Sequence, residues 1–176
     1  VMRDDIVAET TELTRLMGLS NESAADFAQA SLISGKNMNK ITLESIKGIK
    51  AGEKERGVRM NINKVLEATG KVSGEIRAQL GANPAAIAKA ITVAKQFGME
   101  LDKVAAAGNS LLNFEQSIEK ELEAELLTGK QLNLERARLA ALTGDYETLT
   151  REINKNVGDF FEFSKMNVLQ QRALAE

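Results

Sequence analysis

Apolar residues recur at three- and four-residue spacing along most of the chain, which places them on one face of an α-helix. One stripe, within residues 58–80, consists of Ile62, Leu66, Thr69, Val72 or Ser73, Ile76 and Leu80. A second, within residues 101–128, includes Val104, Ala105, Leu111, Leu112, Ile118, Leu122, Leu126 and Leu127. These stripes predict an all-α fold of about seven or eight helices, in which two long amphipathic helices near 58–80 and 101–128 carry shorter helices on their apolar faces.

Glycines and capping side chains divide this pattern into separate elements. Helix ends are expected at Gly18, Gly35, Gly98, Gly129 and Gly144. The side chains placed to cap the start of a following helix are Ser20, Asn83, Asn133 and Asp145. The pair Asn83-Pro84 is the clearest start, because proline suits the first position of a helix.

Small residues have two different predicted effects elsewhere. Gly48, Gly52 and Gly57 interrupt one helical pattern, and each costs about 1 kcal/mol relative to alanine in a helix interior. We therefore expect a break or mobile segment near residues 48–57, with a short-helix segment at 1–57 and a helical bundle at 58–176, or one continuous domain over 1–176. The run Ala-Ala-Ala-Gly at 105–108 removes side-chain bulk and predicts close approach of a neighbouring backbone.

Composition removes several classes of chemistry. The 176-residue chain has no cysteine and no histidine, so disulfides, thiolate metal sites and the commonest general base are excluded. Its 23 basic and 25 acidic residues nearly balance, which gives no long-range field towards nucleic acid or a membrane. No apolar run approaches the roughly 18 residues of a membrane span. The sequence predicts no enzyme, no cofactor, no metal site and no small-molecule substrate.

The pair Gly129-Lys130 raises the question of a phosphate-binding loop. Such a loop has another glycine five positions before this one, and a serine or threonine directly after the lysine. Ala124 and Gln131 occupy these positions, and the Gly-Lys pairs at 35–36 and 70–71 fail in the same way. The pair is therefore predicted to mark the joint between two helices.

Two charged clusters are candidates for a binding site. Glu115, Glu119 and Glu123 share a helix face and could hold a hard cation, although the neighbouring lysine at 120 favours a solvated face. Residues 47–64 carry six basic and two acidic side chains, and the predicted partner contacts among them are Lys50, Lys54, Arg56 and Arg59. No aromatic residue lies between Phe27 and Phe97, which disfavours nucleic acid and favours a solvated or protein-facing surface.

Three phenylalanines, Phe160, Phe161 and Phe163, lie close together near the end of the sequence. They either form an exposed patch for docking a partner or fill a gap between helices as core. Core packing is favoured because the chain contains only six phenylalanines and one tyrosine. The three residues remain predicted partner contacts alongside the basic cluster.

Several stretches resemble the helical modules of tail tape-measure and related virion structural proteins of tailed bacteriophages. They are "LMGLSNESAADFAQASLISGKN" (16–37), "FGMELDKVAAAGNSLL" (97–112) and "EKELEAELLTGKQLNLERARLAALTGDYETLTREI" (119–153). The first two share a Gly-apolar step, Gly18-Leu19 and Gly98-Met99, that leads into an acidic, alanine-rich helix. In the third, a long helix is followed by short ones separated by Thr-Gly. The resemblance implies a long, mostly helical polypeptide that lies inside the tail tube, sets its length during assembly and leaves at genome ejection.

The expected function is a non-enzymatic structural segment of such a virion protein, which makes helix-mediated contacts with itself or with other tail proteins. Its location is then the virion, after synthesis in the host cytoplasm. The chain begins at Val1 and ends in an unfinished helical pattern, so we expect a fragment of something longer. The alternative is a cellular helical adaptor in the cytoplasm, and a lytic or peptidase module is a third reading that no residues support.

Overall fold

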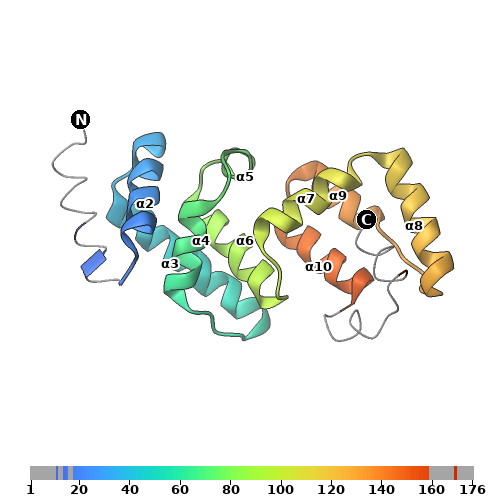
Figure 1. Ribbon diagram of the computed structural model, residues 1–176. Helices are drawn as coiled ribbons and strands as arrows, with labels where there is room; N and C mark the ends of the chain where they lie inside the picture. The colour runs from blue at the N-terminus through green and yellow to red at the C-terminus, as the bar shows by residue number, and fades with distance from the viewer. Residues whose placement is uncertain (1–10, 12–13, 16–17, 159–168, 170–176) are drawn as a thin grey trace. The chain divides into compact units, whose positions relative to one another are not determined.

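The computed structural model describes residues 11, 14–15, 18–158 and 169, and this part of the chain is all-α (Figure 1). The predicted fold class is confirmed: the described residues contain nine helices and no strand. The helices are α2 (Asn21–Ser34), α3 (Met38–Arg56), α4 (Ile62–Lys71), α5 (Gly74–Gln79), α6 (Pro84–Gln96), α7 (Leu101–Leu111), α8 (Phe114–Thr128), α9 (Glu135–Thr143) and α10 (Tyr146–Val157). None of these helices combines the length and the apolar character that crossing a bilayer requires.

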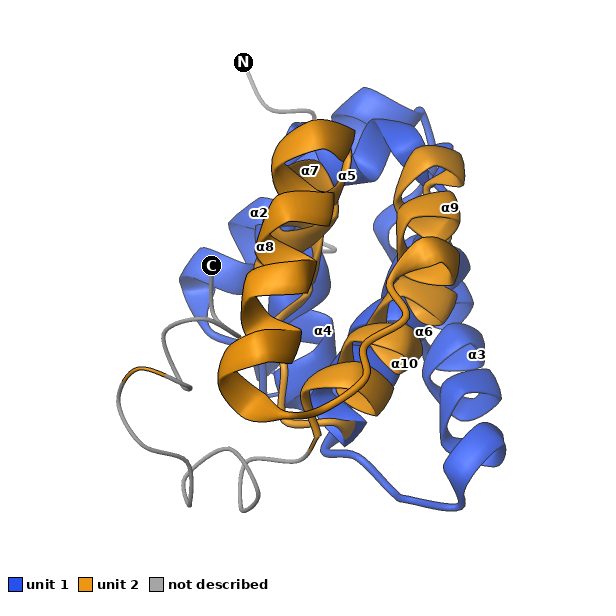
Figure 2. Cartoon of the chain, turned by 90° about the vertical axis from the view of Figure 1, so that its right-hand side faces the viewer, with its two compact units in different colours: residues 1–96 blue, residues 97–176 orange. Residues whose placement is uncertain are grey.

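The helices form two compact units, residues 1–96 and residues 97–176 (Figure 2). The first contains α2 to α6 and buries Phe27, Met38, Ile49, Leu66 and Ile87. The second contains α7 to α10 and buries Val104, Ala137, Tyr146 and Leu149. Helices α3 and α6, on either side of residue 57, form the most extensive helix pair in the described chain, and both belong to the first unit. The expected domains at 1–57 and 58–176, or one domain over 1–176, stay predictions.

The predicted break at 48–57 is wrong, because α3 is continuous from Met38 to Arg56 and ends at Gly57 in the left-handed conformation. Its glycines serve packing. A Cβ atom at Gly48 would overlap the carbonyl group of Ala85 on α6, and one at Gly52 would lie 2.9 Å from the Thr92 side chain. The two backbones approach so closely that no side chain fits between them, and this contact offsets the weak helix propensity of glycine.

The two long amphipathic segments are each divided into two helices. Between α4 and α5, Val72 is extended, and Ser73 starts the new helix by accepting a hydrogen bond from the Ile76 N–H (3.4 Å). Between α7 and α8, the chain leaves the helix at Leu112 and Asn113. Leu66 and Thr69 before the first division and Ile76 after it are all buried, so that stripe packs inwards in both helices.

Most predicted helix boundaries are confirmed. Ser20 caps α2, Asn83 accepts hydrogen bonds from the first turn of α6, and Asp145 caps α10 through the Thr148 N–H (3.0 Å). The helix ends at Gly35, Gly129 and Gly144 all have positive φ angles between 64° and 69°. These signals are local, which is why the sequence alone locates them.

Asn133 does not cap α9, and this prediction is wrong. That helix starts after Leu134 without any side-chain cap. The Asn133 N–H instead donates to Oδ1 of Asn156 on α10 (2.8 Å), and Nδ2 of Asn156 donates to the Asn133 carbonyl (3.1 Å). A side chain 23 positions away therefore satisfies the backbone at this joint.

At residues 105–108 the sequence predicts close approach of a neighbouring backbone, but the close contact at Gly108 is with a side chain. A Cβ atom there would lie 2.8 Å from Cδ2 of Leu149 on α10 and 3.5 Å from Cβ of Ala141 on α9. Helices α9 and α10 therefore both contact α7 at this turn, where its side chains are small or absent.

Replacing Gly48 with alanine should lower the free energy of unfolding by about 1–3 kcal/mol, because the added methyl group overlaps the α6 backbone. Urea denaturation followed by circular dichroism measures this change. Gly74→Ala is the matched control: it lies in a helix, its φ is not positive and a Cβ there meets nothing within 4 Å, so stability should be unchanged or slightly higher. Equal behaviour of the two variants would contradict the packing role of Gly48.

Candidate functional site

Helix α8 turns its largest apolar side chains away from its own unit. Four of them recur at four-residue spacing, and their exposed fractions are 49% for Phe114, 48% for Ile118, 55% for Leu122 and 86% for Leu126. We call these four residues the α8 stripe. The residues that α8 buries are Ser117 and Ala124, which are small. The helix is therefore amphipathic, but a row of large apolar residues faces solvent.

The stripe departs from the sequence-based expectation. Ile118, Leu122 and Leu126 fit a stripe shared with Val104 and Ala105, and were predicted to pack inwards. Only the α7 part of that stripe is buried. A usable signal in the sequence is the density of acidic residues around the α8 leucines, which is unusual for a helix buried on that side.

Polar groups hold the inner side of α8 against the segment that follows it. Glu125 Oε1 accepts a hydrogen bond from the Leu132 N–H (2.7 Å), and Glu121 Oε1 accepts one from the Leu134 N–H (3.0 Å). Arg138 on α9 forms an ion pair with Glu121 and donates to the Ser117 hydroxyl (2.7 Å). These contacts determine which face of α8 points inwards, and so which face stays exposed.

The Gly-Lys pair at the end of α8 is a helix joint, as the sequence predicts. Gly129 has a φ angle of 67°, and its N–H donates to the Glu125 carbonyl (2.9 Å). The Lys130 N–H donates to the Thr128 hydroxyl (3.2 Å). The backbone donors at this joint thus close the end of the helix, as a C-cap does.

A groove of about 1070 Å³ lies on the inner side of α8, between α7, α8 and α10. Its apolar lining comes from Ala106, Ala107, Leu111, Ala124, Leu132, Leu134, Ile153 and Val157. The described residues of its lining also include the charged side chains Lys103, Glu119, Lys120 and Glu121, together with asparagines, serines and a glutamine.

A row of carboxylates runs beside the α8 stripe. Glu115, Glu119 and Glu123, which we call the acidic row, each follow a stripe residue directly and so lie about 100° around the helix from it. In total α8 carries five glutamates and one lysine, a net charge of −4. Within the described residues, no group of three or more acidic side chains converges as metal ligands, which leaves the row as surface charge.

The predicted basic contacts lie in the first unit. Lys50 and Lys54 are exposed on α3, Arg56 is exposed at its end, and Arg59 is exposed in the connection to α4. Arg56 donates to the carbonyl of Gln96 (3.0 Å) and so serves the joint between α3 and α6, and the role of these residues as partner contacts stays a prediction. The two lysines remain a solvent-facing surface.

Phe160, Phe161 and Phe163 lie outside the described residues. Their prediction as a docking patch or as core therefore stays a prediction. Among the described residues of the second unit, α8 carries a row of exposed apolar side chains, and Leu139 and Leu142 are exposed on α9.

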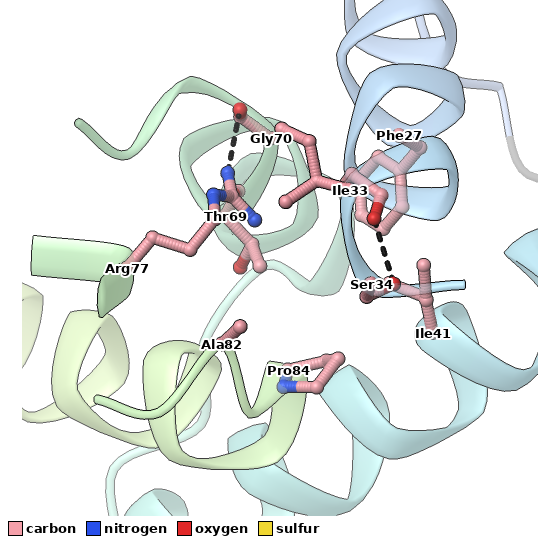
Figure 3. Close-up of a pocket in the computed structure, with 10 residues that line it drawn as sticks. Phe27, Ile33, Ser34, Ile41, Thr69, Gly70, Arg77, Ala82 and Pro84 are labelled. Atoms are coloured by element: carbon pink, nitrogen blue, oxygen red, sulfur yellow. Dashed lines mark hydrogen bonds between the residues drawn. The ribbon is translucent and has the colours of Figure 1, made fainter. Parts of the chain in front are cut away.

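Arg77 lines a small pocket in the first unit together with Phe27 and Pro84 (Figure 3). Its Nη2 donates to the carbonyls of Thr69 and Gly70 (both 3.2 Å) at the end of α4. Burial lowers the pKa of the Arg77 guanidinium, and the charge of the Asp26 carboxylate opposes that shift. The cavity holds only about 10 Å³, the space of one water molecule, so this arginine caps a helix and has no room for a ligand.

Comparison with protein-family models, with curated proteins and with solved structures found no match. The α8 stripe and the acidic row beside it are the candidate binding surface of the described chain.

Replacing Arg138 with alanine should lower the free energy of unfolding by about 2–4 kcal/mol, because Glu121 is then left largely buried without its cation. Amide hydrogen exchange at Leu132 and Leu134 should speed up in parallel. Lys120→Ala removes an exposed ion pair with Glu123 on the same helix and should cost less than about 1 kcal/mol. Similar losses in both variants would contradict the anchoring role of Arg138.

Proposed function

We propose that this chain is a non-enzymatic assembly module that binds another protein through the α8 stripe. The observation that carries the proposal is the exposure of four large apolar side chains in a row on one helix. Contiguous apolar surface of this kind marks interaction sites, and a helix presents it to a groove or to a partner helix. The apolar groove behind α8 adds a second surface suited to contact.

The size of the stripe indicates how strongly one module binds. Full burial of a large apolar side chain is worth about 1.5–3 kcal/mol, so covering three that are about half exposed and Leu126, which is mostly exposed, gains about 4–7 kcal/mol in total. Association costs an estimated 4–15 kcal/mol in lost translational and rotational freedom. One stripe alone therefore gives weak binding, and useful affinity needs further contacts or many modules acting together.

The setting we propose is the virion of a tailed bacteriophage, with this chain as a tape-measure-like structural segment made in the host cytoplasm. Three sequence stretches that resemble the helical modules of those proteins support it, as does a chain of short helices joined at glycine caps. A long protein with repeated modules of this type turns weak single contacts into stable assembly. The partners are then copies of the chain or neighbouring tail proteins.

Replacing Leu122 and Leu126 together with serine should abolish binding to purified tail-tube protein and any self-association, measured by size-exclusion chromatography with light scattering. Both side chains are exposed, so the stability of the single chain should change by less than about 1 kcal/mol. Leu43→Ser, at an exposed leucine on α3, is the control and should leave binding intact.

Two results bear on the alternatives. A wild-type chain that stays strictly monomeric and binds no tail protein contradicts the virion proposal. Stripe-dependent binding to a cellular protein instead supports the helical adaptor.

A further inference from the structure

We infer that the α8 stripe binds an amphipathic helix whose apolar face is flanked by lysine or arginine, and not a second copy of α8. The inference rests on the proposed function and specifies the chemistry of the partner. Its basis is the distribution of charge around the stripe.

The two flanks of the stripe differ in whether their carboxylates already have partners within the described chain. On one flank lies the acidic row, in which Glu115 and Glu119 are exposed and form no ion pair within the described part of the chain. Glu123 is exposed too, and its only described partner is Lys120, at 3.5 Å. On the other flank, Glu121 and Glu125 are occupied by Arg138 and by backbone N–H groups. Negative charge is thus available to a partner on one side only.

A second α8 is a poor partner for this surface. In an antiparallel pair each flank faces the same flank of the other helix, so acidic row would meet acidic row. In a parallel pair the acidic row would meet the flank with Glu121 and Glu125, which offers it no free cation because Arg138 is already paired with Glu121. Packed helices lie about 8–10 Å apart, within about one Debye length at physiological salt, so two helices of net charge −4 repel each other.

The C-terminal end of α8 also favours a partner with positively charged side chains. The last turn of the helix contains no basic residue, although Glu125 lies there and Glu123 just before it. Carboxylates at this end also face the partial negative charge of the helix dipole. Leu126, the most exposed residue of the stripe, lies in the same turn. A partner that covers Leu126 and brings a lysine or arginine to Glu119 and Glu123 buries the exposed leucine and neutralises the two carboxylates.

The length of the stripe gives the length of the partner. Phe114 and Leu126 are twelve residues apart, which is about 18 Å along the helix axis. A partner helix of about three turns or more, with leucine or isoleucine at three- and four-residue spacing and basic residues along one edge, matches it.

The basic face of α3 does not meet this description. Lys40, Lys47 and Lys54 recur every seven residues on its exposed side, but Leu43 is the only large apolar side chain exposed on that helix. It offers charge without an apolar stripe. We therefore do not infer that α8 binds α3 of a second copy, and the experiment below detects such dimerisation if it occurs.

The test uses two fluorescein-labelled synthetic helical peptides of about sixteen residues with the same leucine stripe, one flanked by lysine and one by glutamate. Fluorescence anisotropy is recorded while the full chain is added. The lysine-flanked peptide should bind at least about tenfold more tightly at low salt, and the ratio should shrink as salt screens the charges. Glu119→Lys/Glu123→Lys should reverse the preference, and Leu122→Ser/Leu126→Ser should abolish binding of both peptides.

Glu22→Lys/Glu75→Lys is the control, since it changes the net charge equally at exposed positions in the first unit. It should keep the preference for the lysine-flanked peptide, and circular dichroism should show the same helix content in every variant. The inference is overturned if binding needs the leucines but the glutamate-flanked peptide binds as well or better, or if the wild-type chain dimerises through α8 or α3. Binding of both peptides that survives loss of the leucines overturns the proposed function itself.

Discussion

The structure depends on the close approach of helices at residues with little or no side chain. In the first unit, α3 meets α6 at Gly48 and Gly52, and in the second, α7 meets α9 and α10 at Gly108. A chain with only 4% aromatic residues has few large side chains with which to fill a core. Close contact at these glycines then supplies many of the small dispersion terms that bulky residues supply elsewhere. The contact is with the Ala85 backbone at Gly48, and with the Thr92 and Leu149 side chains at Gly52 and Gly108.

Helix α8 is held differently. It buries only Ser117 and Ala124, and a groove lies on its inner side. Carboxylates do the anchoring instead: Glu121 and Glu125 bind the following segment and Arg138. The inner glutamates are thereby occupied while the acidic row stays available. An apolar stripe with charge on one edge is thus a product of how the second unit is held together.

Local signals and distant contacts differ in how far the sequence reveals them. The caps at Ser20, Asn83 and Asp145 join a side chain to a backbone group two or three residues away, so the residue types alone locate them. The joint before α9 is satisfied by Asn156, from another helix, and no local pattern indicates it. For the same reason Gly48 and Gly52 resemble helix breakers in the sequence: their purpose lies on α6, more than thirty residues further along.

The sequence by itself determined that the chain is helical, where most helices begin and end, and that cysteine and histidine chemistry is excluded. Tertiary structure alone decided which apolar stripes are buried. Val104 and Leu122 fit one continuous helical stripe, yet the first is core and the second is surface, because the chain leaves the helix at Leu112 and Asn113. Helical periodicity defines a face, but what covers that face depends on neighbours that the periodicity does not specify.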